Sequence, residues 1–343
     1  MRRPVFKSCS GLTAGLALLA SLALPAHADE VADFYKGRNV SLVIGYSVGG
    51  GYDAYGRLVA RYLGKHVPGN PNIVPQNMTG AGSLRAANYL YTAAAKDGSV
   101  IGTFSRSLAI APLLDKAEFD SRNFAWLGSV TDDTSVCVTR AESAVKTWDD
   151  LLAKPSTFGG EGAGADPDIF ALLYKNVFGA KIKLVSGYPG TNDTVLAMER
   201  GEVDGLCGLS WSTIKTRHGD WIKDKRVNIL VQAAQKKEPD LAAVPLATDL
   251  AKGEEQRRIL KVLLVSQAIA RPFAAPPGIP AERRAALVAA FAATMKDPEF
   301  LGEAARLAFD VNPVSAATID ALLAEAYAFP KDVLAKAAQA ITN

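Results

Sequence analysis

The chain has 343 residues, of which 49% are hydrophobic and 21% charged, and its formal net charge at pH 7 is +3. Three of its 38 basic residues and none of its 35 acidic residues precede residue 29, so the 315 residues that follow residue 28 carry no net charge. This balance argues against nucleic acid or an anionic membrane surface as a partner, because both favour a basic patch. The length allows two domains of ordinary size.

The N-terminus has the pattern of a secretory signal peptide. Arg2, Arg3 and Lys7 precede an apolar stretch at 11–24, and Ala26-His27-Ala28 forms a small-x-small cleavage site. We predict that residues 1–28 are removed on export to the periplasm. The apolar stretch is too short to span a bilayer, so the mature protein is not expected to be embedded in a membrane.

The next two thirds of the chain alternate short apolar runs with amphipathic segments, which is the rhythm of βαβ units and predicts the α/β class. The predicted strands are 40–46, 99–104, 126–130, 136–139, 182–185 and 227–231. The predicted helices are 53–66, 83–95, 166–178 and 191–200. Alanine-rich helices at 281–295, 299–307 and 316–327 predict a helical C-terminal region.

Glycine-rich turns recur before the predicted helices, at 49–51, 80–82 and 159–164, and a fourth turn at 189–192 follows a strand. In an open α/β sheet such turns lie at the carboxyl ends of strands, where ligands bind. A glycine backbone permits close approach, and the first amides of a helix attract anions. Each turn taken alone is equally explained by a glycine that ends a strand; their recurrence favours an anion site.

Each of two charged side chains close to these turns has two possible roles, one functional and one structural. Asp53 could contact a ligand, but an aspartate at the start of a helix is more often an N-cap, and we favour the cap. Arg106 follows a buried strand and could bind a carboxylate in fork geometry, or it could be a solvated surface arginine.

Catalytic patterns are incomplete. Gly49-x-Gly51-x-x-Ala54 matches a dinucleotide fingerprint, yet no acidic residue occurs from 54 to 96 to bind the ribose. The segment around Ser210 approximates a nucleophile elbow, but only His66 and His218 could serve as bases. Metal-ligand spacing is absent from the sequence. We therefore expect no enzyme activity, no cofactor and no metal, with an exported serine hydrolase that uses Ser210 as a less favoured alternative.

Cys137 and Cys207 are the two cysteines that follow the signal peptide. In an oxidising compartment they could form one disulfide, or both could be buried free thiols. Sequence separation does not show whether their side chains meet, and we favour free thiols.

Taken together, these segments resemble the substrate-binding receptors of tripartite tricarboxylate transporters, the Bug-type periplasmic proteins. The resemblance runs from about Phe34 to about Phe329. It depends on the order and spacing of motifs within 40–53, 76–82, 95–99, the loop before Asp166, 201–204 and 275–280.

The resemblance implies two α/β domains that close on a small anion like a Venus flytrap of type II, without catalysis. Domain 1 would comprise 29–130 plus 236–343 and domain 2 residues 131–235, with crossings at 126–139 and 227–235. The protein would be a monomer that delivers a di-, tri- or aromatic carboxylate to an integral membrane permease. A receptor for a sensor kinase is the alternative within the binding class. The implied ligand-binding residues are Ser47, Gly49, Gly50, Gly51, Tyr52, Asp53, Gly82, Ser83, Arg106, Gly162, Ala163, Gly164, Asp166, Gly190, Thr191, Asn192 and Asp193.

The chain departs from the family pattern at its predicted site. Tyr46-Ser47-Val48 replaces a proline-rich approach to the glycine triplet, and the ring of Tyr52 could favour a flat ligand. Glu161 and Asp166 place acids in a loop that should receive a carboxylate, which would lower affinity unless they point away, cap a helix or pair with Arg106.

Overall fold

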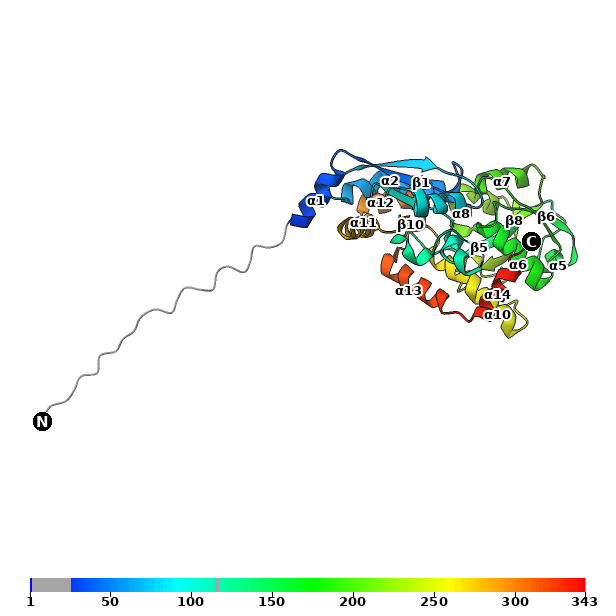
Figure 1. Ribbon diagram of the computed structural model, residues 1–343. Helices are drawn as coiled ribbons and strands as arrows, with labels where there is room; N and C mark the ends of the chain where they lie inside the picture. The colour runs from blue at the N-terminus through cyan, green and yellow to red at the C-terminus, as the bar shows by residue number, and fades with distance from the viewer. Residues whose placement is uncertain (2–25, 115–116, 343) are drawn as a thin grey trace.

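The computed structural model describes residues 1, 26–114 and 117–342; most of the predicted signal peptide lies outside the described residues. The described strands form two mixed sheets, which Figure 1 shows side by side along the molecule. We call each sheet with its covering helices a lobe. The α/β class and the two-sheet architecture predicted from the sequence are confirmed.

The first sheet has the strand order β11-β4-β10-β3-β1-β2. Its strands are β1 (Asn39–Ile44), β2 (Asn72–Asn77), β3 (Val100–Thr103), β4 (Ala125–Ser129), β10 (Pro272–Ala275) and β11 (Val314–Ser315). The β1, β2 and β3 strands are parallel, whereas β10 runs antiparallel to β3 and β4. The carboxyl ends of β1 and β3 therefore meet at one edge of the sheet.

Alternating side chains of the first sheet pack into two apolar layers. Val40, Leu42 and Ile44 join one core cluster, while Val43 between them joins the other. The first layer is covered by α1 (Ala26–Tyr35), α2 (Gly51–Leu63), α11 (Ala281–Thr294) and α12 (Pro298–Arg306). The second layer is covered by α3 (Leu84–Asn88), the π-helical turn Tyr89–Ala93 and α13 (Ala316–Tyr327).

The second sheet has the order β7-β6-β8-β5-β9. Its strands are β5 (Ser135–Arg140), β6 (Ser156–Gly159), β7 (Ile182–Val185), β8 (Gly205–Ser210) and β9 (Val227–Ala233). The core on one face includes side chains of α5 (Trp148–Ala153) and α6 (Asp166–Phe178), and the core on the other includes those of α7 (Thr191–Glu199), α8 (Trp211–Arg217) and α9 (Gly219–Lys223). The chain enters this lobe between β4 and β5 and leaves it after β9.

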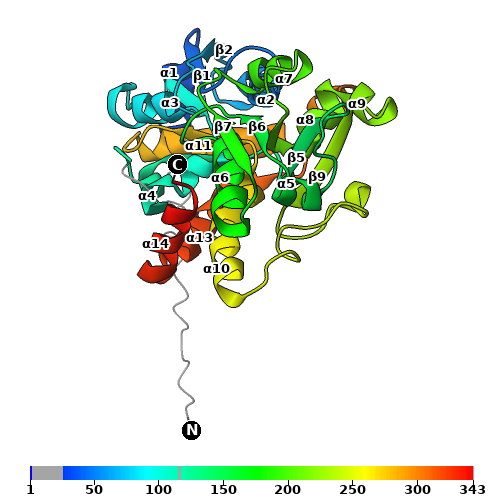
Figure 2. The same ribbon diagram turned by 90° about the vertical axis from the view of Figure 1, so that its right-hand side faces the viewer.

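Two C-terminal helices add to the core of the second lobe. Apolar side chains of α10 (Glu254–Leu263) and α14 (Lys331–Ala340) share one cluster with α6 and the second sheet. Figures 1 and 2 show α10, α13 and α14 together on one side of the molecule. The short helices α4 (Ala111–Leu114), Gly64–His66, Arg106–Ala109, Ser121–Asn123, Pro239–Leu241 and Leu264–Ile269 complete the described helical elements.

Cys137 and Cys207 form a disulfide in the core of the second lobe. They lie on the adjacent antiparallel strands β5 and β8, whose register brings the two side chains onto the same apolar face. Our expectation of two free thiols was therefore wrong, because it could not use the pairing of strands that are 70 residues apart in the sequence.

Candidate functional site

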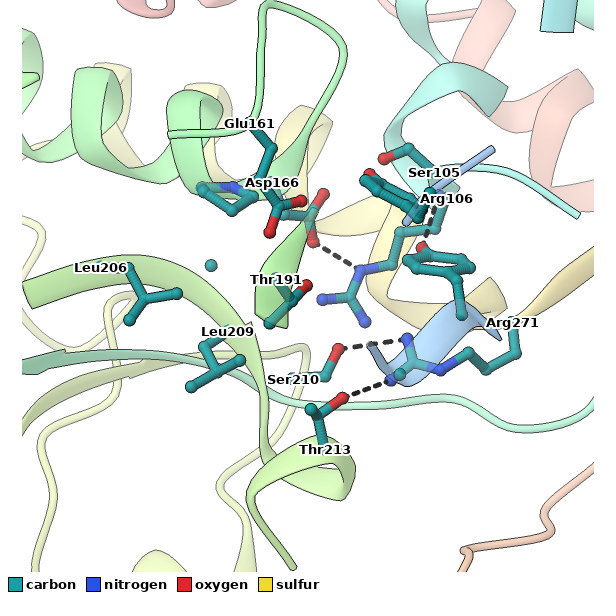
Figure 3. A pocket seen from close by; sticks show the side chains of 15 residues that line it. Ser105, Arg106, Glu161, Asp166, Thr191, Leu206, Leu209, Ser210, Thr213 and Arg271 are labelled. Atoms are coloured by element: carbon teal, nitrogen blue, oxygen red, sulfur yellow. Dashed lines mark hydrogen bonds and ion pairs between the residues drawn. The ribbon is translucent and has the colours of Figure 1, made fainter. Parts of the chain in front are cut away.

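A narrow cavity lies between the two lobes at the carboxyl ends of their strands. The first lobe contributes Tyr46, Gly51, Tyr52, Ser105, Arg106 and Arg271. The second contributes Glu161, Asp166, Pro167, Thr191, Leu206, Gly208, Leu209, Ser210 and Thr213, and Figure 3 shows side chains from both lobes converging. Its volume is about 20 Å³, room for about one water-sized group. A larger ligand must therefore separate the lobes.

Helix N-termini form part of the cavity wall. Gly51 and Tyr52 begin α2, Asp166 and Pro167 begin α6, and Thr191 begins α7. The first amides of a helix lack intrahelical partners and carry the positive end of its dipole, so three such ends favour a bound anion.

An ion pair joins the lobes in the cavity. Nε of Arg106 lies 2.5 Å from Oδ2 of Asp166, and the side chains are only 2% and 8% exposed. Nη2 of Arg106 also donates to Oγ of Ser135 at 2.6 Å. Oδ2 of Asp166 accepts further hydrogen bonds from Nε2 of Gln267 at 3.1 Å and Oγ of Ser135 at 3.3 Å. Arg106 is thus a buried residue of the cleft rather than a solvated surface arginine.

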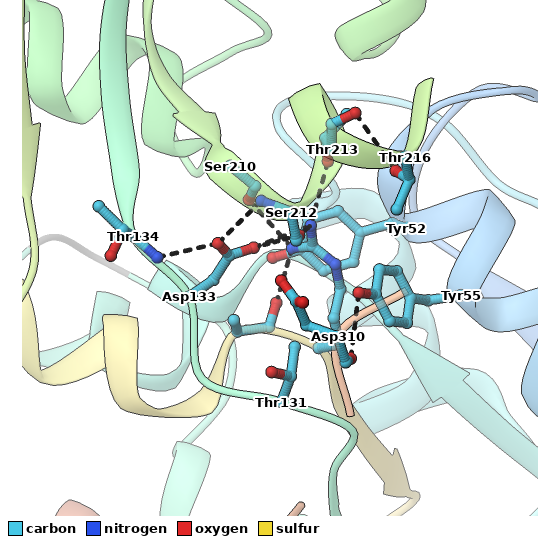
Figure 4. Close-up of polar contacts among 12 residues, drawn as sticks. Tyr52, Tyr55, Thr131, Asp133, Thr134, Ser210, Ser212, Thr213, Thr216 and Asp310 are labelled. Carbon is cyan, nitrogen blue, oxygen red and sulfur yellow. Dashed lines mark hydrogen bonds and ion pairs between the residues drawn. The ribbon is translucent and has the colours of Figure 1, made fainter. Parts of the chain in front are cut away.

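Arg271 is a second buried arginine, which the sequence analysis missed. Nη2 donates to Thr213 Oγ1 at 3.1 Å and Ser212 Oγ at 3.0 Å and pairs with Asp133 at 3.3 Å. Nη1 donates to Ser210 Oγ at 3.2 Å (Figure 3). Figure 4 shows Asp133 and Ser212 meeting in this network. A lone arginine in the apolar stretch from Leu263 to Ala275 was the available sequence signal.

The side chain of Tyr52 is fixed by its contacts with Tyr46, Arg271 and Arg106. It stacks on Tyr46 at 4.7 Å between centroids, and the Arg271 guanidinium lies 4.8 Å from its centroid. Its hydroxyl accepts a hydrogen bond from the amide of Arg106 at 2.9 Å. These contacts position Arg106 and leave Tyr52 poorly placed to stack on a flat ligand.

Glu161 is buried in the same wall, with 4% of its surface exposed. Burial raises the pKa of its carboxyl from the usual 4.5 to about 8; a hydrogen bond from Thr191 opposes this shift, and the negative charges of Asp168, Asp166 and Asp193 add to it. The group is therefore mostly protonated at pH 7 and can act as a hydrogen-bond donor.

The two lobes touch along a rim, which we define by three contacts. Oγ of Ser47 donates to Asp193 at 2.6 Å, the amide of Gly82 donates to the carbonyl of Glu161 at 3.0 Å, and Oγ of Ser107 donates to the carbonyl of Gly164 at 2.9 Å. The described structure is thus a closed arrangement of the lobes.

Five residues of the predicted ligand set line the cavity: Gly51, Tyr52, Arg106, Asp166 and Thr191. Others lie at or near the rim. A Cβ on Gly162 would meet the amide of Gly82, one on Gly190 would meet Ser47, and one on Gly49 would lie close to Asn192. Gly50 caps α2, Ser83 accepts a hydrogen bond from the amide of Ser105, and Ala163 is exposed.

Asp53 and Asp168 hold the two loops whose amides were expected to bind the ligand. Asp53 is buried and accepts hydrogen bonds from the amide of Gly49, from Arg57 and from Asn77. Asp53 is therefore not the N-cap that we favoured, because Gly50 holds that position and Asp53 lies in the first turn of α2; its carboxylate supports the loop instead. Asp168 accepts hydrogen bonds from the amides of Glu161 and Gly162 at 2.6 and 2.9 Å. Those two amides are therefore already occupied.

Two other kinds of feature are absent from the described residues. None of the described helices has both the length and the apolar character needed to cross a bilayer. No cluster of three or more histidine, cysteine, aspartate or glutamate side chains suited to a metal ion occurs in that part of the chain.

Two α/β lobes, two chain crossings between them and a cleft at the carboxyl ends of their strands define a two-domain periplasmic binding protein fold. Comparison with solved structures places the fold more narrowly. The periplasmic binding protein BugD superposes with a TM-score of 0.69 at 19% identity, covering 89% of this chain and 97% of BugD. MatC of Rhodopseudomonas palustris, solved with bound malate, superposes with a TM-score of 0.69 at 20% identity. The match covers 87% of this chain and 99% of MatC. The fold is that of the Bug-type proteins, as the sequence motifs indicated.

Sequence comparison gives matches of higher identity over a smaller part of the chain. No protein-family model matches the chain. A UPF0065 protein from the TAR-I ttuE-ttuC' intergenic region of Agrobacterium vitis is 30% identical over 205 residues, which cover 57% of this chain and 58% of that protein. A UPF0065 protein from the gbd 5' region of Cupriavidus necator is 24% identical over 262 residues, which cover 74% of this chain and 76% of that protein.

Proposed function

We propose that the protein is a periplasmic solute-binding receptor that captures a small organic acid between its lobes and delivers it to a tripartite tricarboxylate-type permease. The observation that carries this proposal is Arg106, a buried cation in a cleft that is also lined by three helix N-termini. A guanidinium and oriented amides bind a carboxylate strongly where water is excluded.

The solved relatives agree with this class of ligand. MatC was solved with malate, and a second Rhodopseudomonas palustris protein, with a TM-score of 0.66 and 18% identity, was solved with adipate. Both ligands are dicarboxylates. We extend to this chain the carboxylate class, the periplasmic location and the monomeric state, while the permease is the partner that the fold family implies.

We also propose that the two lobes move as the domains of the receptor, with boundaries at 29–130 plus 236–343 and at 131–235. The packing favours one amendment to this division. Because α10 and α14 share a core with α6, they should move with the second lobe.

The alternative of a serine hydrolase gains no support from the geometry. The hydroxyl of Ser210 accepts a hydrogen bond from Arg271, a cation that cannot serve as a general base. His66 is bonded to Asp297, and His218 stacks on Trp221. Both histidines are thus engaged elsewhere. No observation favours a sensor-kinase receptor over a transport receptor.

A thermal-shift screen of the mature protein tests the proposal. The panel contains dicarboxylates, tricarboxylates, aromatic acids and amino acids. A ligand present at about 100 times its Kd stabilises the native state by about 2.7 kcal/mol, so at least one acid should raise Tm by several degrees. Arg106→Gln should abolish that rise.

Arg122→Gln is the matched control, because Arg122 is a half-exposed arginine of the first lobe that pairs with Asp120. It should respond as the wild type does. A panel without any effect on Tm, or a full response in Arg106→Gln, would refute the proposed function.

A further inference from the structure

The ion pair between Arg106 and Asp166 limits which acids the cleft can hold. Arg106 follows β3 in the first lobe and Asp166 begins α6 in the second, so a ligand that enters between the lobes separates them. Each charge is buried, and a buried charge without a partner is strongly unfavourable. The ligand must therefore replace both halves of the pair.

The unpaired polar atoms of the cavity indicate the same requirement. Among the cavity-lining side chains that the structure describes, Nη1 of Arg106, Nε of Arg271, Oδ1 of Asp166 and Oε1 of Glu161 are buried without a hydrogen-bond partner. The two arginine nitrogens are donors, and the other two atoms are carboxyl oxygens. Buried polar atoms are rarely left unpaired, so this set calls for one acceptor and one donor group on the ligand.

We propose that the ligand is zwitterionic, with a carboxylate that pairs with Arg106 and a protonated amine that is bound by Asp166 and Glu161, as in an amino acid. This inference rests on the proposed function and narrows its ligand class. The carboxylate takes the place of Asp166 beside Arg106, and the ammonium takes the place of Arg106 beside Asp166.

A second carboxylate in place of the amine has no comparable site. On the Asp166 side of the pair it would face the negative charge of Asp166 beside the carboxyl group of Glu161, which can donate a hydrogen bond but supplies no positive charge (Figure 3). Arg271 is less available than Arg106, because Asp133 neutralises its charge and Ser210, Ser212 and Thr213 accept from its terminal nitrogens, although its Nε is unpaired. Gln267 and Ser135 can solvate Asp166 but cannot neutralise it.

Glu161 makes the amine contact dependent on pH. It faces Asp166 and Asp168 of α6, Thr191 and Asp193 of α7, and Tyr46 after β1, and the pKa of its carboxyl is raised to about 8. An ammonium group favours the ionised carboxylate, so binding near pH 7 should release a proton. Affinity for an amino acid should therefore increase from pH 6 to pH 8.

The test uses isothermal titration of the mature protein with pairs of acids that differ only in the amine. The pairs are alanine and propionate, aspartate and succinate, glutamate and glutarate, and phenylalanine and 3-phenylpropionate. In the pair that binds, the amino acid should bind about 100-fold or more tightly than its deaminated partner, because a site built for a polar group strongly rejects the analogue that lacks it. Glu161→Gln should reduce this preference at least about tenfold and remove its pH dependence.

Asp166→Asn provides a second variant. It should lower the affinity for the amino acid and leave the affinity for the deaminated acid unchanged. Glu254→Gln, an exposed carboxylate-to-amide change on α10, should leave both affinities unchanged. A deaminated acid that binds as tightly as its amino acid would overturn the inference and leave the proposed function standing. If no member of any pair binds, the inference falls, whereas the proposed function falls only if the wider panel of the thermal-shift screen also has no effect on Tm.

Discussion

At the scale of single residues, the site contains more charged side chains than the glycine-rich turns and Arg106 led us to expect. Two arginines and two carboxyl groups line the cavity, and two amides of the second-lobe loop are already bonded to Asp168. The sequence placed Arg106 and Asp166 near the site and allowed them to pair. For Arg271 the signal was only a lone arginine in an apolar stretch, and for the unpaired oxygen of Glu161 there was none, since the contacts of both residues join segments far apart in the chain.

Glu161 should make the stability of the protein fall as the pH rises. The pKa of its carboxyl is about 8 in the folded state and 4.5 ordinarily, so the folded protein binds more protons than the unfolded chain between these values. Its stabilising contribution is present in full below pH 4.5 and is lost as the pH rises to about 8. Chemical denaturation at pH 5.5, 7 and 8.5 should show this loss.

Glu161→Gln should flatten the dependence, because an amide does not titrate. The difference in unfolding free energy between wild type and variant, followed as a function of pH, separates the contribution of Glu161 from those of other groups that titrate in the same range. An identical slope in both proteins would show that Glu161 is solvated in the native state.

At the scale of elements, the sequence predicted strands rich in β-branched and other apolar residues and missed strands that proline or glycine interrupts. The β2 strand contains Pro75 and lies at the sheet edge, where a missing amide is tolerated. Gly205 and Gly208 weaken the strand pattern of β8, and β10 begins at Pro272. Their strand conformation comes from their neighbours in the sheet rather than from local propensity.

The disulfide between β5 and β8 should stabilise the second lobe substantially. It closes a loop of 70 residues, for which the chain-entropy model gives about 4 kcal/mol at 25 °C. A variant with both Cys137→Ala and Cys207→Ala should lose a comparable part of its unfolding free energy in urea. The reduced wild type should match the variant; equal stability of the oxidised and reduced wild-type protein would contradict this account.

At the scale of the whole molecule, the proposed function requires the lobes to part for binding and then to close along the rim. Gly190→Ala should prevent the closing step. The φ of Gly190 is 176°, which any residue can adopt, but a Cβ there would lie 2.5 Å from Oγ of Ser47 in the opposite lobe. The variant should therefore fold with unchanged stability and bind the most effective acid of the screen at least about tenfold more weakly.

Gly219→Ala is the matched control in the same lobe, because a Cβ at Gly219 meets no atom within 4 Å. Titration calorimetry gives the affinities, and small-angle scattering at saturating acid should show a larger radius of gyration for Gly190→Ala than for the control. Equal affinities and radii in both variants would mean that rim contact is not part of binding.

In the exported protein that we propose, formation of the disulfide would be a maturation step. Directly after Cys207 come Gly208, Leu209 and Ser210, all three of which line the cavity. The covalent bond thus anchors one wall of the ligand site to the strand on which the chain enters the second lobe. In protein produced in a reducing cytosol, this wall of the cavity would lack its covalent anchor. Oxidation after export would stabilise the second lobe and fix the shape of this wall in one step.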